Sequence, residues 1–143
     1  MTRIDDLDLV VAVYGTLRRG GRNEGLLEGA THLGTGTIEG GLHEMVTEAG
    51  RPYPYPGVVA EEGGRVVVEI VRLADPGQLA RLDALEDYNP ADEAASEYLR
   101  RRVAVAGGPV AEAWAYLYAG PPGAIGPQID SGDWIAHVRG SAD

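Results

Sequence analysis

The sequence predicts an α+β protein, a small mixed, mostly antiparallel β-barrel flanked by a few helices. Short apolar runs bounded by glycine and proline recur along the chain, which is typical of strand-rich proteins. Turn sequences at Gly63-Gly64 and at residues 106–109 join neighbouring runs, so we expect most strand pairs to be antiparallel hairpins. Only the segment from Asp75 to about Glu86 carries strong helix signals.

The expected elements follow one another closely. Asp75 is a candidate N-cap, with Pro76 at the first helical position and Gln78 three residues after the cap. Glycine at 40 and 41 permits a bend in a long strand. We expect strands at residues 9–14, 32–46, 57–60, 65–73, 100–105 and 110–118, a helical turn at 23–28, a polar loop at 87–97 and a short helix opening near 131–134.

Composition limits the classes of partner. A chain of 143 residues with 44% hydrophobic residues is expected to form one domain, 1–143, with a core that needs no disulfides. The net charge of −10 argues against nucleic acid and anionic membranes. The chain has no cysteine, which excludes a thiol nucleophile. The acidic start at residues 1–6 and the lack of a membrane-spanning apolar run favour the cytoplasm. The sequence does not indicate an oligomeric state.

The segment Val10 to Gly20 is the first candidate for a binding site. An apolar run ends at Tyr14 and Gly15, and Thr16 and Leu17 follow before two arginines and two more glycines. A buried strand that ends in such a tight loop can point several backbone N–H groups at one anion. An ordinary strand-to-loop turn explains the same pattern. The segment lacks the lysine of a P-loop.

The helix carries the second candidate. At 100° per residue, Glu86 falls between Leu79 and Leu82, inside the leucine face of the helix. Asp83 and Asp87 fall outside that face, so we expect only Glu86 to point inward. A buried carboxylate is costly unless it is paired or used as a general acid/base. The alternative is a Glu86 that turns outward or pairs with Arg81 or Arg100.

Other chemistries lack a pattern. The three histidines are scattered without metal-ligand spacing, so we predict no metal site. No Gly-x-Ser-x-Gly sequence is present, which argues against a serine hydrolase. The segment 53–56, Tyr-Pro-Tyr-Pro, fits either a pocket wall or a stiff turn.

Taken in order, these motifs resemble the gamma-glutamylcyclotransferase-like family over nearly the whole chain. The resemblance rests on residues 13–20, 40–42, 55–57, 67–70, 82–86, 98–100, 113–116 and 129–134. It implies a cofactor-free mixed β-barrel with one pocket. It also implies an enzyme that closes a γ-glutamyl amide to 5-oxoproline and releases an amine or amino acid.

The resemblance assigns roles to residues of this chain. Glu86 is implied as the general acid/base, and the N–H groups of Gly15, Thr16 and Leu17 as the site for the substrate's α-carboxylate, with Tyr14 shaping the pocket. Tyr98 and Tyr118 are implied as further substrate-binding residues. Two alternatives stay open: a non-catalytic domain that binds an amino-acid-like ligand, and an enzyme that removes a γ-glutamyl protecting group in biosynthesis. The leaving amine is not indicated.

Overall fold

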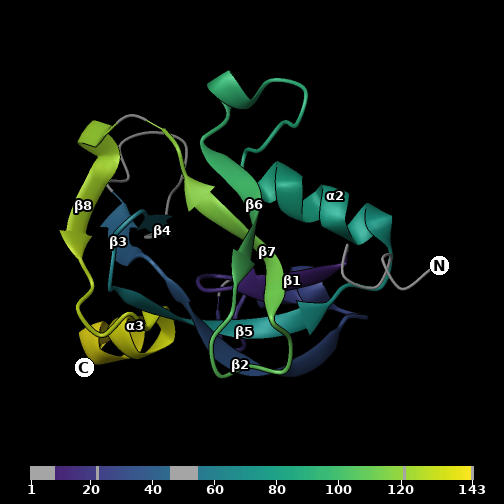
Figure 1. Cartoon of the computed structure of the whole chain (residues 1–143), viewed down its shortest axis with the longest axis horizontal. Helices are drawn as coiled ribbons and strands as arrows, with labels where there is room; N and C mark the ends of the chain where they lie inside the picture. Colours follow the sequence, from purple (N-terminus) through teal and green to yellow (C-terminus); the bar gives the residue numbers. More distant parts are fainter. Residues whose placement is uncertain (1–8, 22, 46–54, 121, 143) are drawn as a thin grey trace.

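A computed structural model of the chain describes residues 9–21, 23–45, 55–120 and 122–142, and it contains two β-sheets (Figure 1). The larger sheet has the order β2-β5-β1-β7-β6 and the smaller has the order β4-β3-β8. The strands of the larger sheet are β1 (Val10–Val13), β2 (Thr31–Glu39), β5 (Arg65–Arg72), β6 (Tyr98–Ala104) and β7 (Glu112–Tyr118). Those of the smaller are β3 (Gly41–Met45), β4 (Pro56–Val59) and β8 (Ile125–Gln128).

Among the described residues, two α-helices and three 3₁₀ turns accompany the sheets. They are η1 (Glu24–Leu27), α2 (Pro76–Leu85), η2 (Glu93–Ala95), η3 (Pro122–Ala124) and α3 (Trp134–Ala142). Helix α2 lies over β1 and β7, whereas α3 lies at the other end of the molecule beside the smaller sheet (Figure 1). None of the described helices is long and apolar enough to cross a membrane.

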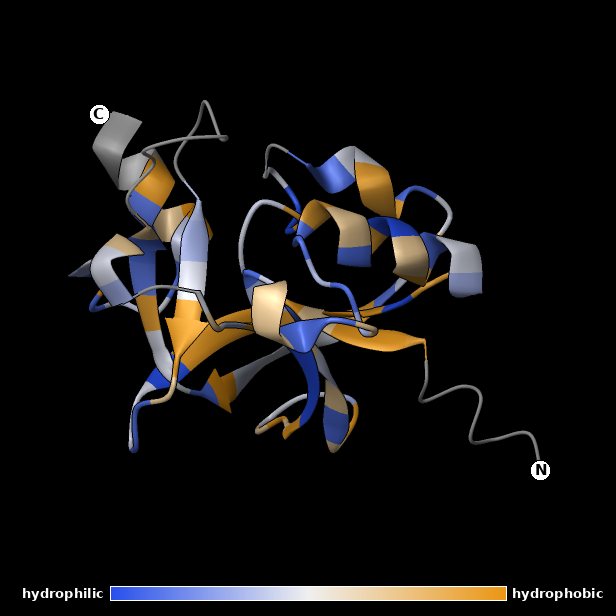
Figure 2. Cartoon of the chain, turned by 90° about the horizontal axis from the view of Figure 1, so that it is seen from above, coloured by the Kyte–Doolittle hydropathy of each residue, from blue (hydrophilic) through white to orange (hydrophobic). Residues whose placement is uncertain are grey.

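Strand β1 forms the centre of the larger sheet. It pairs antiparallel with β5 and parallel with β7, and its four residues are all buried. A central strand covered on both faces needs a continuous apolar run, which explains the sequence Val-Val-Ala-Val. In Figure 2 the hydrophobic colour is concentrated along the strands in the middle of the molecule. The end of β1 is therefore a rigid point from which the next loop starts.

Gly40 separates β2 from β3. The expected long strand at 32–46 is two strands that belong to different sheets, and residue 46 lies outside the described residues. Gly40 has φ of +151°, and a Cβ there would lie 2.7 Å from Val58 Cγ1. A side chain at this position would therefore be strained and crowded.

Helix α2 begins as the sequence predicts. Asp75 accepts a hydrogen bond from Gln78 N–H at 2.9 Å, and Pro76 is the first helical residue. The Gln78 side chain accepts from Ala74 N–H and does not return to the cap. Leu82 is fully buried among Val11, Val13 and Val71 and other apolar residues of the larger sheet. This packing places the C-terminal end of α2 near the end of β1.

The α+β class and the mostly antiparallel pairing are confirmed, since β1–β7 is the single parallel strand pair among the described residues. Within the described ranges, the strands form two sheets and do not close into one barrel. A bridge between Thr37 and Ala106 links β2 to the β6–β7 turn. Strand β8 was not expected, because its Gly126 and Pro127 are typical of a loop. Pairing with β3 makes this segment a strand.

Candidate active site

A small pocket lies where β1 ends. The side chains and backbone around it come from the loop after β1, the start of β4, the end of α2 and the middle of β7. Its cavity volume is about 20 Å³, and it opens to solvent. The lining residues are Ala12, Val13, Tyr14, Gly15, Thr16, Leu17, Tyr55, Pro56, Glu86 and Tyr116. The loop and the acid that the sequence singles out separately therefore meet at one pocket.

The loop after β1 presents unused hydrogen-bond donors to this pocket. Among the hydrogen bonds of the described residues, none uses the N–H group of Gly15, Thr16 or Leu17. The following N–H groups are occupied: Arg18 N–H donates to Gly15 O, and Arg19 N–H donates to Glu69 Oε1. Buried backbone N–H groups are nearly always paired in folded proteins. Three neighbouring N–H groups at a pocket are donors that an anionic group could use.

Gly15 has no room for a side chain. A Cβ there would lie 2.5 Å from Pro56 Cγ, and a proline ring cannot rotate away. This contact brings the loop against the first residue of β4 and closes one side of the pocket. The glycine is thus explained by the close approach of the two segments.

Arg18 holds the loop in place through ion pairs with Glu69 and Asp133. Its Nε donates to Glu69 Oε2 at 3.0 Å and its Nη1 donates to Asp133 Oδ1 at 2.7 Å. The Arg18 side chain is only 9% exposed and that of Glu69 10%. Glu69 also accepts the Arg19 N–H, so one carboxylate holds both the side chain and the backbone of the loop. This network connects the loop to β5 and to the residue that precedes α3.

Asp133 contributes to stability in a pH-dependent way. Burial by itself raises the pKa of Asp133, but hydrogen bonds from Ala136 N–H and Arg18 outweigh burial and hold the pKa below its usual range. Because the folded state holds the charged form, this stabilisation is present above the unfolded pKa of about 3.9 and is lost as the pH falls through the folded pKa. We expect Asp133→Asn to flatten the fall of unfolding free energy below about pH 4. Urea unfolding of both proteins between neutral and acidic pH measures this, and equal slopes would contradict it.

Four tyrosine hydroxyls near the pocket donate their protons elsewhere. The three donors to backbone or loop groups are Tyr14 to Tyr116 O at 2.6 Å, Tyr98 to Pro56 O at 2.7 Å and Tyr55 to Glu97 Oε2 at 2.9 Å. Tyr116 donates to Asp83 Oδ1 at 2.6 Å. A phenol has one proton to donate, so these four tyrosines cannot also donate to an anion in the pocket. The backbone N–H groups of the loop are the donors that remain for it.

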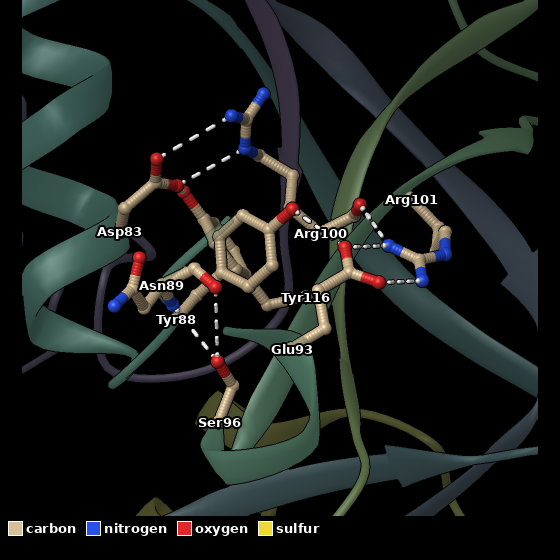
Figure 3. A network of polar contacts seen from close by, with 8 residues as sticks. All are labelled: Asp83, Tyr88, Asn89, Glu93, Ser96, Arg100, Arg101 and Tyr116. Atoms are coloured by element: carbon tan, nitrogen blue, oxygen red, sulfur yellow. Dashed lines mark hydrogen bonds and ion pairs between the residues drawn. The ribbon is translucent and has the colours of Figure 1, made fainter. Parts of the chain in front are cut away.

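The end of α2 places two carboxylates beside β7. Glu86 directly follows the last helical residue, is half-buried and lines the pocket. Asp83 was expected to face outward, and this expectation is wrong: its side chain is 13% exposed and is paired with Arg100 Nε at 3.0 Å. Figure 3 shows the Asp83 carboxylate between the Arg100 guanidinium and the Tyr116 hydroxyl. Arg100 therefore pairs with Asp83, not with Glu86.

Tyr116 keeps its proton in this environment. Burial raises the pKa of the Tyr116 hydroxyl far above its usual value, and the hydrogen bond to Asp83 and the negative charges of Asp83 and Glu86 raise it further. Glu86 and Tyr116 both line the pocket, and the Tyr116 hydroxyl stays protonated at neutral pH.

The structure brings together five of the residues that the sequence indicates: Tyr14, Gly15, Thr16, Leu17 and Glu86. The other two, Tyr98 and Tyr118, are not among the lining residues. Tyr98 is fully buried, and its hydroxyl donates a hydrogen bond to the Pro56 carbonyl. The Tyr118 ring packs edge-on against the Tyr98 ring, with 5.5 Å between the ring centroids. Their role in substrate binding stays a prediction.

Sequence reasoning left Tyr55 open, as part of a pocket wall or of a stiff turn, and it missed Tyr116 and the carboxylate of Asp83. Tyr55 belongs to the Tyr/Pro segment, of which residues 53 and 54 lie outside the described part. Tyr116 alternates with Trp114 along one strand face, which signals packing as strongly as ligand contact. In the part of the chain that the structure describes, no cluster of histidine, aspartate or glutamate is arranged to hold a metal ion.

The fold and site define a class of protein. A strand-end loop with unused N–H donors faces one half-buried carboxylate across a small pocket, which suits acid/base chemistry on an anionic ligand. Residues 11–136 match the family model "Gamma-glutamyl cyclotransferase, AIG2-like". The chain belongs to this family.

Individual relatives agree with this assignment. A Vibrio cholerae protein named "Putative gamma-glutamylcyclotransferase" is 36% identical over 129 residues, which cover 90% of this chain and 97% of that protein. An uncharacterized Pyrococcus horikoshii protein of known structure is 26% identical with a TM-score of 0.67, covering 94% of this chain and 95% of the other. A mouse AIG2-like protein is 23% identical with a TM-score of 0.62, covering 85% and 86%. The likeness to the mouse protein supports the fold.

Proposed function

We propose that this protein is a cyclotransferase that converts a γ-glutamyl amide to 5-oxoproline and a free amine. The observation that carries the proposal is the meeting of Glu86 with the unused N–H groups of residues 15–17 at one pocket. Family membership supports the same chemistry. The reaction is an intramolecular acyl transfer and needs no protein nucleophile, which suits a chain without cysteine.

The α-carboxylate of the substrate binds the N–H groups of Gly15, Thr16 and Leu17. Backbone donors fixed by the Arg18 network hold an anion without losing side-chain entropy. Gripping the carboxylate leaves the glutamyl side chain free to fold back, so that the α-nitrogen approaches the γ-carbonyl carbon. Because the two reacting atoms are held close together, the reaction is an intramolecular ring closure and needs no collision between separate molecules.

Glu86 moves the proton. It takes one proton from the α-ammonium, and the resulting amine forms a bond to the γ-carbonyl carbon. Glu86 then gives a proton to the leaving nitrogen while the bond between that nitrogen and the γ-carbon breaks. The products are 5-oxoproline and the amine, which carries away the second proton lost by the ring nitrogen. A half-buried carboxylate in the wall of the pocket is placed to exchange protons with a bound substrate.

The negative charge that develops on the γ-carbonyl oxygen needs hydrogen-bond donors. The tyrosine hydroxyls near the pocket are not available as donors, because their protons are already used. The hydroxyls of Tyr14, Tyr55 and Tyr116 already donate to other groups of the protein. Two of the three loop N–H groups suffice for the two oxygens of the α-carboxylate, and the third is the donor that remains for the oxyanion.

The test is a turnover screen with the purified protein. γ-Glutamyl amides of small amines and γ-glutamyl amino acids serve as substrates, and 5-oxoproline is measured by mass spectrometry. Matched α-glutamyl isomers are the control, because their α-nitrogen has no γ-amide to attack. Release of 5-oxoproline from γ-amides alone is the expected result. Ligand binding without release from any substrate would contradict the proposal and favour a non-catalytic binding domain.

A further inference from the structure

The Tyr116 hydroxyl donates a hydrogen bond to Asp83, near the C-terminal end of α2. Asp83 and Glu86 are three residues apart and so share one edge of the helical segment. Tyr116 reaches this edge from β7, lines the pocket with Glu86 and is 3% exposed. Its hydroxyl takes no part in the proposed mechanism.

The direction of the Tyr116 proton is determined by its surroundings. The hydroxyl donates to Asp83 Oδ1 at 2.6 Å, and Asp83 is held in place by Arg100 through contacts of 3.0 and 3.4 Å (Figure 3). Arg100 in turn stacks over the Trp114 ring at 4.6 Å. With its one proton committed to Asp83, the phenol oxygen can only accept a hydrogen bond from the pocket.

We propose that Tyr116 is a substrate-binding residue whose oxygen accepts a hydrogen bond from the α-nitrogen of the γ-glutamyl substrate, with Asp83 and Arg100 as its positioning residues. The inference rests on the proposed cyclotransferase function and specifies which part of the substrate this wall of the pocket recognises. The substrate class is an α-amino acid that carries both charges on its α-carbon.

The distribution of donors and acceptors supports this assignment. The loop side of the pocket offers N–H groups, which suit a carboxylate and repel an ammonium. The wall formed by Glu86 and Tyr116 offers acceptors, with a second negative charge behind it at Asp83. An α-amino acid presents a carboxylate and an ammonium from one carbon, and it matches both sides at once.

A second acceptor also serves the reaction. An ammonium that contacts only Glu86 can rotate freely about the bond to its α-carbon. A hydrogen bond to the Tyr116 oxygen would fix that rotation, so that the lone pair uncovered by proton transfer points at the γ-carbonyl carbon. Such orientation is a main source of rate in ring-closing reactions.

The test compares two unreactive ligands that differ at this nitrogen. 5-Oxo-L-proline carries the ring N–H, and 3-oxocyclopentane-1-carboxylate has a methylene in its place. We expect Tyr116→Phe to weaken binding of 5-oxoproline by about tenfold, the effect of one hydrogen bond, and to leave binding of the carbocycle unchanged. Calorimetry measures both. An equal loss for the two ligands, or no loss for either, overturns the proposal.

Tyr88→Phe is the matched control. The Tyr88 ring packs edge-on against Tyr116 at 6.5 Å, but its hydroxyl donates to Glu93 Oε2, and Tyr88 does not line the pocket. Its removal leaves the affinity for both ligands unchanged, and a selective loss of 5-oxoproline affinity in this variant would overturn the assignment to Tyr116.

If Tyr116→Phe does not fold, the wild type labelled with ¹³C at tyrosine Cζ decides the question. The Tyr116 signal should shift more with 5-oxoproline than with the carbocycle, and an equal response overturns the proposal. Failure of the cyclotransferase function is seen separately, as a wild type that neither releases 5-oxoproline nor binds it.

Discussion

Glu86→Gln abolishes release of 5-oxoproline while the protein stays folded. The amide has the same shape as the carboxylate but neither takes nor returns a proton, so the general acid/base contribution of about 10²- to 10⁴-fold is lost. Glu86 is half-buried at the end of α2, and its substitution removes no core contact comparable with that of Leu82. The measurement is kcat on the best γ-glutamyl amide, together with circular dichroism and thermal unfolding.

Asp87→Asn is the matched control for this variant. Asp87 is the next residue, is exposed and does not line the pocket. Its φ of +56° is one that asparagine adopts readily, so the backbone stays in place. We expect turnover within about twofold of the wild type, since this charge has no proposed role. Retained turnover in Glu86→Gln would remove Glu86 as the proton carrier.

Arg18→Met destabilises the protein by about 3 to 5 kcal/mol, the range measured when one member of a buried ion pair is removed. Glu69 and Asp133 lose their charged partner, and Glu69 stays buried with only the Arg19 N–H as a donor. The total stability of a domain is about 5 to 15 kcal/mol, so this loss lowers the urea midpoint strongly. Because Arg18 also fixes the loop, we expect a higher KM in the protein that remains folded.

Arg19→Met is the control, and it tests the same charge one position away. The Arg19 side chain is exposed, and its contact with Glu69 is made by the backbone N–H, which the substitution keeps. We expect a change within about 0.5 kcal/mol, as for most exposed positions. Equal urea midpoints for the two variants would show that the Arg18 network is not a major source of stability.

Local patterns in the sequence determined several parts of the fold and site. The run Val10–Val13 predicts a buried strand because only a central strand needs four apolar residues in succession. Asp75 and Pro76 predict the start of α2 because capping depends on residues within one turn. The helical wheel directs Glu86 inward, and the structure places Glu86 at the pocket. Each of these signals involves neighbours in the chain.

Contacts between distant residues decided the rest. Asp83 lies outside the leucine face of the helix, but Arg100 and Tyr116, which are 17 and 33 residues away, hold it inside. Arg18 pairs with residues 51 and 115 positions away, and no local pattern signals such a network. Strand β8 has the composition of a loop and becomes a strand only by pairing with β3. Hydrogen-bond partners and buried charges depend on which elements pack together, so periodicity within one element could not reveal them.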